Sequence, residues 1–238
     1  MRINRAILFA VVLVAACSSD TDAGGGTTVT VPGTEPTTVT SAPGTEPTTT
    51  VEGPAIWPAA DVVFTEPEAA AADFVTKALG VPPKLGEFQQ GDARSGEIEV
   101  YVAGEGVVAP TAPRSLLLLR QLGPDDGWFV IAAANENATI SSPEPAAEVP
   151  AGPLAAEGVA QGFEASVSVT AFLAGDADAQ LDQVVTQAGN FDGPLPWSVS
   201  LDLSGAAPGD IVALLVRGGA GLETDPGEFG AIPVVIAG

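Results

Sequence analysis

The spacing of apolar and polar residues divides the chain into three regions. Residues 6–16 form a continuous apolar run, and residues 18–54 contain almost nothing that could be buried. From residue 57 onward, apolar residues recur with the periods of helices and strands. Only this last pattern can bury enough apolar surface to form a core, so we expect the folded part of the chain to begin near residue 57.

The first periodic stretch predicts one amphipathic helix that runs to Leu79. Thr65 and Glu68 match the Thr-x-x-Glu capping box, and Pro67 falls in the first turn, where a missing N–H costs no hydrogen bond. Gly80 then supplies a helix stop. The expected apolar face consists of Ala71, Phe74, Val75 and Ala78.

Strand patterns follow the helix. In residues 97–102 apolar and polar positions alternate, and residues 115–121 and 128–133 are joined by the turn-forming segment 123–127, as in a hairpin. The consecutive leucines at 116–119 predict a strand buried on both faces. We therefore expect residues 57–137 to form a small α+β domain, with one helix on a three- or four-stranded antiparallel sheet.

Residues 138–238 predict an all-β, immunoglobulin-like sandwich. About seven short strand patterns occur here, separated by Gly, Pro and Asp clusters, as is typical of this fold. They cover residues 139–141, 154–160, 163–171, 182–188, 197–203, 210–217 and 231–236. Because no disulfide can form within the chain, we expect Trp197 and the phenylalanines to fill the core between the two sheets.

The N-terminal run predicts export and lipid anchoring. Arg2 and Arg5 precede an apolar stretch that is too short to span a bilayer, which is the pattern of a cleaved export signal. The run ends in Leu13-Val14-Ala15-Ala16-Cys17, which resembles a bacterial lipoprotein lipobox. This resemblance implies that residues 1–16 are a signal peptide, and that Cys17 carries lipid with acyl chains such as palmitate. The protein would then sit on the extracytoplasmic face of the cell membrane.

Residues 17–56 follow as the lipid anchor and a Thr- and Pro-rich linker. The segment Pro-Gly-Thr-Glu-Pro-Thr-Thr occurs twice, at 32–38 and 43–49. Frequent prolines remove the hydrogen-bond donors that a strand needs, so we expect a disordered or polyproline-like spacer. Such stalks are also typical acceptors of glycosylation.

The charge of the chain excludes some partners. The formal net charge is −22, and removal of residues 1–16 leaves 6 basic and 30 acidic residues, a net charge of −24. Such a protein repels nucleic acids and anionic head groups, so we expect no nucleic-acid binding and favour cationic partners.

The residue types argue against catalysis. The chain contains no histidine, and its one cysteine is expected to carry lipid, so we predict no enzyme, no cofactor and no metal site. The segment Asp176–Asp182 has the oxygen spacing of a calcium loop, but Leu181 replaces the turn glycine and Gln187 the bidentate glutamate. A solvated acidic loop explains it better.

Short motifs in residues 138–238 resemble the Gmad2 family, the immunoglobulin-like domain associated with bacterial spore germination proteins. The motifs are Ile140 with Pro143, Gly152-Pro153-Leu154, Glu157-Gly158-Val159-Ala160, Phe163-Glu164-Ala165, Pro196-Trp197-Ser198, Pro208-Gly209-Asp210 and Ile232-Pro233-Val234-Val235-Ile236. The resemblance implies a domain without catalytic residues on exported, often lipidated envelope proteins. Many relatives carry a GerMN domain beside it, for which residues 57–137 hold no matching motif.

Three functions remain open from the sequence. The first is a monomeric, membrane-anchored interaction or scaffold module that holds an envelope protein or a wall component. The second is a ligand-binding lipoprotein that delivers a small anion to a transporter, for which Arg94, Arg114 and Arg120 could form a basic face. The third is a hydrolase that uses paired carboxylates. A pocket on the first sheet would favour the second function, and a cleft with facing carboxylates would favour the third.

Overall fold

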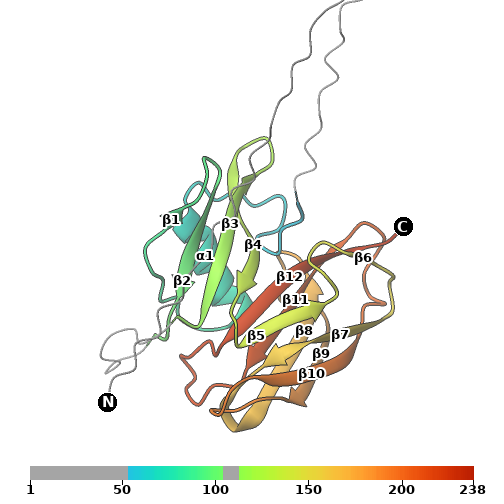
Figure 1. Ribbon diagram of the computed structural model, residues 1–238. Helices are drawn as coiled ribbons and strands as arrows, with labels where there is room; N and C mark the ends of the chain where they lie inside the picture. The colour runs from blue at the N-terminus through green and yellow to red at the C-terminus, as the bar shows by residue number, and fades with distance from the viewer. Residues whose placement is uncertain (1–52, 104–112) are drawn as a thin grey trace, which may run out of the picture. The chain divides into compact units, whose positions relative to one another are not determined.

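Figure 1 shows the computed structural model, which describes residues 53–103 and 113–238. The predicted signal peptide, the lipidation site Cys17 and nearly all of the predicted linker lie outside these residues. The described residues all belong to one compact unit. Within the described ranges, no helix has the length and apolar character needed to cross a membrane.

The predicted helix is present as α1 (Pro67–Ala78), and of its predicted apolar face Ala71, Phe74 and Val75 are buried, whereas Ala78 is half-buried. Phe74 and Val75 are fully buried, and Lys77 pairs with Asp73 at 2.9 Å on the outer face. The predicted capping box is wrong, because the N-cap residue is Glu66 and no side chain caps the helix. Pro67, whose fixed φ suits the first helical position, therefore sets the helix start one residue later than a Thr65 cap would.

The first strands are β1 (Gln89–Gln90), β2 (Ser95–Val100), β3 (Ser115–Leu122) and β4 (Gly127–Ala134), each antiparallel to the next. Figure 1 shows α1 lying across one face of this sheet. Leu117 and Leu119 are buried on the α1 side, whereas Leu116 and Leu118 are only half-buried. The prediction that β3 is buried on both faces is therefore wrong, because the helix covers only one of them.

All seven predicted strands of the sandwich are present, and one short strand, β6, was not predicted. Their bounds are β5 (Ala138–Ser142), β6 (Glu148–Val149), β7 (Pro153–Ala160), β8 (Ser166–Leu173), β9 (Gln180–Gln187), β10 (Leu195–Asp202), β11 (Ile211–Gly218) and β12 (Phe229–Ile236). Residues Phe163–Ala165, expected at the start of a strand, instead form a 3₁₀ turn, η1.

Strands from both predicted segments join in one sheet. Its order is β1-β2-β3-β4-β12-β11-β8-β9, with β6 parallel to β12, and the second sheet has the order β10-β7-β5. Within this sheet the two segments meet at β4 and β12, where Ala133 pairs with Ala231. The core around α1 also crosses the predicted boundary at 137/138, since it includes Phe172 and Phe229 from the sandwich strands.

The core between the two sheets of the sandwich contains Trp197 as predicted, but no phenylalanine of the described ranges belongs to it. It is filled by alanine, valine, leucine and isoleucine side chains of both sheets. Successive residues of a strand point to opposite faces. Ala171 therefore lies in the sandwich core, and its neighbour Phe172 packs on the α1 side. Phe163 and Phe191 are exposed.

Candidate interaction site at the loop end of the sandwich

Three loops, residues 161–165, 188–194 and 218–228, meet at one end of the sandwich. The backbone N–H of Gly162 donates to the carbonyl of Gly189 at 3.0 Å, and that of Phe163 donates to Gly219 at 2.8 Å. A Cβ atom on Gly162 would lie 2.2 Å from the carbonyl oxygen of Ser166, so only glycine permits this approach. The loops are thus tied to one another by their backbones.

The 188–194 loop presents Phe191 to solvent. Asn190, Phe191, Asp192 and Gly193 form a tight turn, in which Gly193 N–H donates to the Asn190 carbonyl at 3.0 Å. The side-chain Oδ1 of Asn190 also accepts the Asp192 N–H at 2.9 Å, which is the local bond that favours asparagine at the first turn position. Phe191 is 85% exposed as a result.

Phe163 lies beside Phe191, with ring centroids 6.3 Å apart and an edge-to-face angle of 72°. It is 44% exposed. The next two residues, Glu164 and Ala165, have left-handed φ values of 55° and 59°, which are costly for residues other than glycine. This strained turn places an aromatic side chain at the surface, whereas the alternation of a regular strand would have directed it to the interior.

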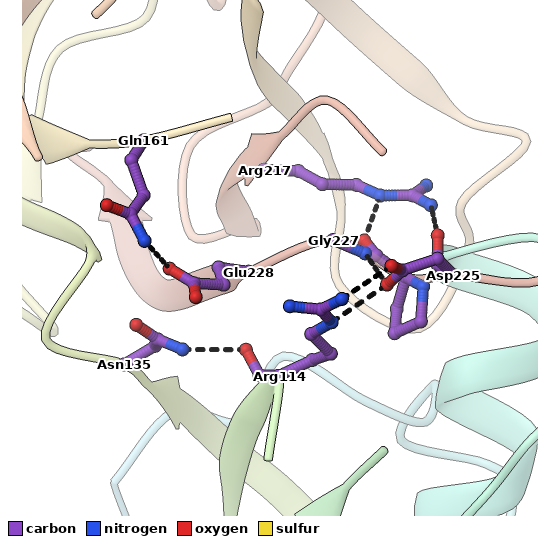
Figure 2. A network of polar contacts seen from close by, with 8 residues as sticks. Arg114, Asn135, Gln161, Arg217, Asp225, Gly227 and Glu228 are labelled. Carbon is purple, nitrogen blue, oxygen red and sulfur yellow. Dashed lines mark hydrogen bonds and ion pairs between the residues drawn. The ribbon is translucent and has the colours of Figure 1, made fainter. Parts of the chain in front are cut away.

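A part-buried ion pair holds the 218–228 loop to Arg114, the residue before β3 (Figure 2). The Arg114 Nη2 and Nε atoms donate to the two carboxylate oxygens of Asp225 at 2.7 and 3.0 Å. Asp225 is 8% exposed, and its Oδ1 also accepts the N–H of Gly227 at 2.9 Å. Asn135 Nδ2 donates to the Arg114 carbonyl at 2.7 Å, so the arginine is itself fixed. Such bidentate, charge-assisted pairs are geometrically specific.

Arg217 of β11 braces the same loop from its other side. Its guanidinium donates to the carbonyl oxygens of Asp225 at 3.2 Å and Leu79 at 2.9 Å, and also to that of Pro226. Burial lowers the pKa of Arg217, and the nearby Asp225 acts to raise it. Arginine keeps its charge in proteins, so this side chain joins the helix end, β11 and the loop as a fixed cation.

The three loops surround a pocket of about 280 Å³. Its walls include the rings of Phe163 and Phe191 and the side chains of Gln161, Asn190, Arg114, Asp225 and Glu228. Gln161 Nε2 donates to Glu228 Oε2 at 2.9 Å (Figure 2). Since Arg114 and Asp225 neutralise each other, Glu228 leaves the pocket with one net negative charge.

Further exposed apolar side chains lie near the pocket. Leu222, in the 218–228 loop, is 60% exposed and shares a second hollow with Val185 of β9, which is 68% exposed. Leu195, at the start of β10, is 56% exposed. We call these three residues together with Phe163 and Phe191 the loop-end surface. It offers aromatic and aliphatic contacts in a rigid setting.

The arginines proposed as a basic face each meet a carboxylate. Arg94 pairs with Asp126 at 2.8 Å, Arg120 lies 3.9 Å from Asp92, and Arg114 is bound by Asp225. The backbone N–H of Arg94 donates to Asp92 Oδ1 at 2.7 Å, and this bond is the main cause that lowers the pKa of Asp92. The Asp92 carboxyl thus stays ionised. The charges of these three arginines are therefore compensated.

The acidic segment 176–182 uses its oxygens for backbone contacts. Asp176 Oδ1 accepts the N–H groups of Asp178 and Ala179 at 3.1 and 3.3 Å. Asp182 accepts from Gln183 and from Asp202 of the opposite sheet at 2.7 and 2.8 Å. Among residues 53–103 and 113–238, no three His, Cys, Asp or Glu side chains are placed to hold a metal ion.

Sequence reasoning missed the central residues of this site. Phe163 was assigned to a strand interior, and neither Phe191 nor Glu228 was singled out. The segment Asn190–Gly193 carried a usable signal, because a turn of this composition with phenylalanine at its second position exposes the ring. Glu228 and Asp225 carried none, since their partners Gln161 and Arg114 lie 67 and 111 residues away.

The comparison with known families concerns this part of the chain. Residues 137–216 match the family model Gmad2, described as the immunoglobulin-like domain of bacterial spore germination. This segment is a Gmad2-like domain. The resemblance drawn from the short motifs is thus confirmed, and the Gmad2-like segment contains Gln161, Phe163 and Phe191, whereas the 218–228 loop follows it. No curated protein and no solved structure matches the chain.

Proposed function

We propose that the protein is a non-catalytic interaction module of the cell envelope, held at the extracytoplasmic membrane face by lipid on Cys17. Its loop-end surface binds a partner protein or wall component. The observation that carries this proposal is the exposed Phe163–Phe191 pair, displayed by two loops that backbone hydrogen bonds tie to each other and to the 218–228 loop. The Gmad2-like domain, an immunoglobulin-like fold type, supports a role without catalysis.

The energetics of the loop-end surface support binding. Phenylalanines buried at the centre of an interface are among the side chains that contribute most to affinity. Here Phe191 is 85% exposed, so its ring is available for burial by a partner. Because the loops are already fixed by hydrogen bonds, binding would cost little loop ordering.

The alternative of an anion-binding lipoprotein has weaker support. A hollow of about 440 Å³ does lie on the first sheet, but its walls carry Glu87, Glu97 and Glu99. Three carboxylates would repel a small anion. The hollow thus disfavours the small anion that Arg94, Arg114 and Arg120 were expected to attract.

A carboxylate hydrolase also has weaker support. Such an enzyme needs two carboxyl groups that face one bond, one of them free to donate a proton. In the loop-end pocket, Asp225 is engaged by Arg114 and by the Gly227 N–H. This leaves Glu228 as the one carboxylate of the pocket that does not pair with an arginine.

Site-specific crosslinking tests the proposal. A photoreactive amino acid replaces Phe191 in cells that express the full-length chain, and a matched variant carries it at Glu157, an exposed residue of β7 in the other sheet. We expect one defined adduct from position 191 and none from position 157. Equal labelling at both positions, or no adduct at 191, would contradict a partner at the loop end. An adduct between two copies of the chain would indicate self-association and contradict the proposed monomer.

A further inference from the structure

We infer that the loop-end pocket receives a cationic side chain, arginine or lysine, from the partner. This inference rests on the proposed function and adds the chemistry of recognition. It combines the size of the pocket, its charge and its aromatic wall.

The pocket has the dimensions of a site for one side chain. Its volume of about 280 Å³ lies just below the range of about 300–1,000 Å³ found for small-molecule and cofactor sites. It is also built from three backbone-linked loops, so its shape is present before binding. A single long side chain inserted from a partner surface fits this geometry.

The charge of the pocket selects a cation. The Arg114 guanidinium is bound through Nε and Nη2 by Asp225, so these two groups present no net charge to a ligand. The Glu228 carboxylate is the other acidic group of the pocket, and Gln161 occupies only its Oε2 atom. In the part of the chain that the structure describes, no hydrogen bond engages Glu228 Oε1. That oxygen can accept a charge-assisted hydrogen bond from a guanidinium or an ammonium.

The aromatic wall acts in the same direction. A phenyl ring has a negative face that attracts a cation within about 6 Å of its centre, and arginine is the most frequent partner. Among the described residues, Phe191 is the most exposed of the large apolar side chains, so its ring is accessible to an incoming group. The formal charge of −22 adds long-range attraction. Ring, carboxylate and overall field thus favour the same kind of partner.

A titration with amino-acid amides tests this inference. The purified full chain is labelled with ¹⁵N, and amide shifts are followed on addition of N-acetyl-arginine amide. The uncharged isostere N-acetyl-citrulline amide is added at matched chloride concentration, and N-acetylglucosamine serves as a probe for wall glycans. We expect arginine to shift the amides of residues 161–163, 190–192 and 219–221, with affinity at least about fivefold above that of citrulline.

Two variants locate the effect. Phe191→Ala removes the exposed ring, and Glu228→Gln removes the charge but keeps an oxygen for Gln161. Each should weaken arginine binding about three- to fivefold. The matched controls Val62→Ala and Glu157→Gln alter side chains that are exposed and do not line the pocket. Both should leave the affinity for arginine unchanged.

The outcomes separate this inference from the proposed function. Equal shifts with arginine and citrulline, shifts with the sugar alone, or loss of binding in the control variants would overturn the cationic specificity. Absence of any shift would overturn the pocket as the binding site. In either case a defined adduct from position 191 would still support the interaction module. Conversely, arginine binding without an adduct from position 191 would support the cationic specificity of the pocket and contradict the proposed binding of a partner at the loop-end surface.

Discussion

Removing the Asp225 carboxylate should loosen the loop that forms one wall of the pocket. Asp225 is buried and accepts three hydrogen bonds, two from Arg114 and one from Gly227. A hydrogen bond to a charged group contributes roughly 1.5–3 kcal/mol, and breaking a buried pair costs about 3–5 kcal/mol. The Arg114 side chain is 32% exposed, so water recovers part of this loss. We therefore expect Asp225→Ala to lower the free energy of unfolding by about 3 kcal/mol.

Asp225→Asn provides a graded comparison. The amide oxygen can still accept the Gly227 N–H, but the charge opposite Arg114 is gone, so we expect a loss of about 1.5 kcal/mol. Urea denaturation followed by tryptophan fluorescence measures both variants. Trp57, Trp128 and Trp197 are all at least nine-tenths buried and distributed over both sheets, so they report on the whole fold.

A double-mutant cycle isolates the ion pair. We expect Arg114→Ala and Asp225→Ala to show a coupling energy of about 2 kcal/mol. The matched control is the cycle of Arg94→Ala with Asp126→Ala, whose side chains are 43% and 65% exposed, and exposed pairs couple by about 0.2–1 kcal/mol. Equal coupling in the two cycles would refute the claim that the Arg114–Asp225 pair fixes the loop.

Phe229→Ala should cost about 3–5 kcal/mol in one cooperative transition, because Phe229 lies in the core cluster that the two predicted segments share; separate transitions in urea would contradict this. Tyr101, the single tyrosine, donates a hydrogen bond to Glu99 that raises the pKa of Tyr101 above 10.0. Glu99→Ala should therefore lower the pKa of Tyr101, as measured by absorbance titration at about 295 nm. That bond stabilises the fold below pH 10.0, and its contribution is lost as the pH rises through the raised pKa. Cys17→Ser should abolish incorporation of labelled fatty acid, and continued incorporation would rule out Cys17 as the lipid site.

Periodicity was sufficient to predict most elements of the fold. The helix ending near Leu79 and the strands that flank the turn at 123–127 were predicted because short-range alternation and turn composition are local properties. The capping box failed because Pro67 determines the first helical position more strongly than Thr65. The expected burial of all four leucines failed because covering both faces depends on a second layer, which the local pattern does not report.

The site depended on contacts that no local pattern encodes. The pairing of Ala133 with Ala231 extends one sheet across both segments and brings Arg114 to the 218–228 loop. The left-handed turn at Glu164 and Ala165 also breaks the strand alternation that assigned Phe163 to the interior. The Gmad2-like motifs predicted the fold, but the residues that shape the pocket became visible only when the loops were placed together.

The affinity of the crosslinked partner for purified variants tests the central claim most directly. Phe191→Ala should weaken the complex about tenfold or more, as expected for an aromatic residue at the centre of an interface. Val62→Ala, which removes apolar surface from an exposed residue that does not line the pocket, should bind like the unaltered chain. If the Phe191→Ala protein binds its partner with unchanged affinity, the loop-end surface is not the binding site.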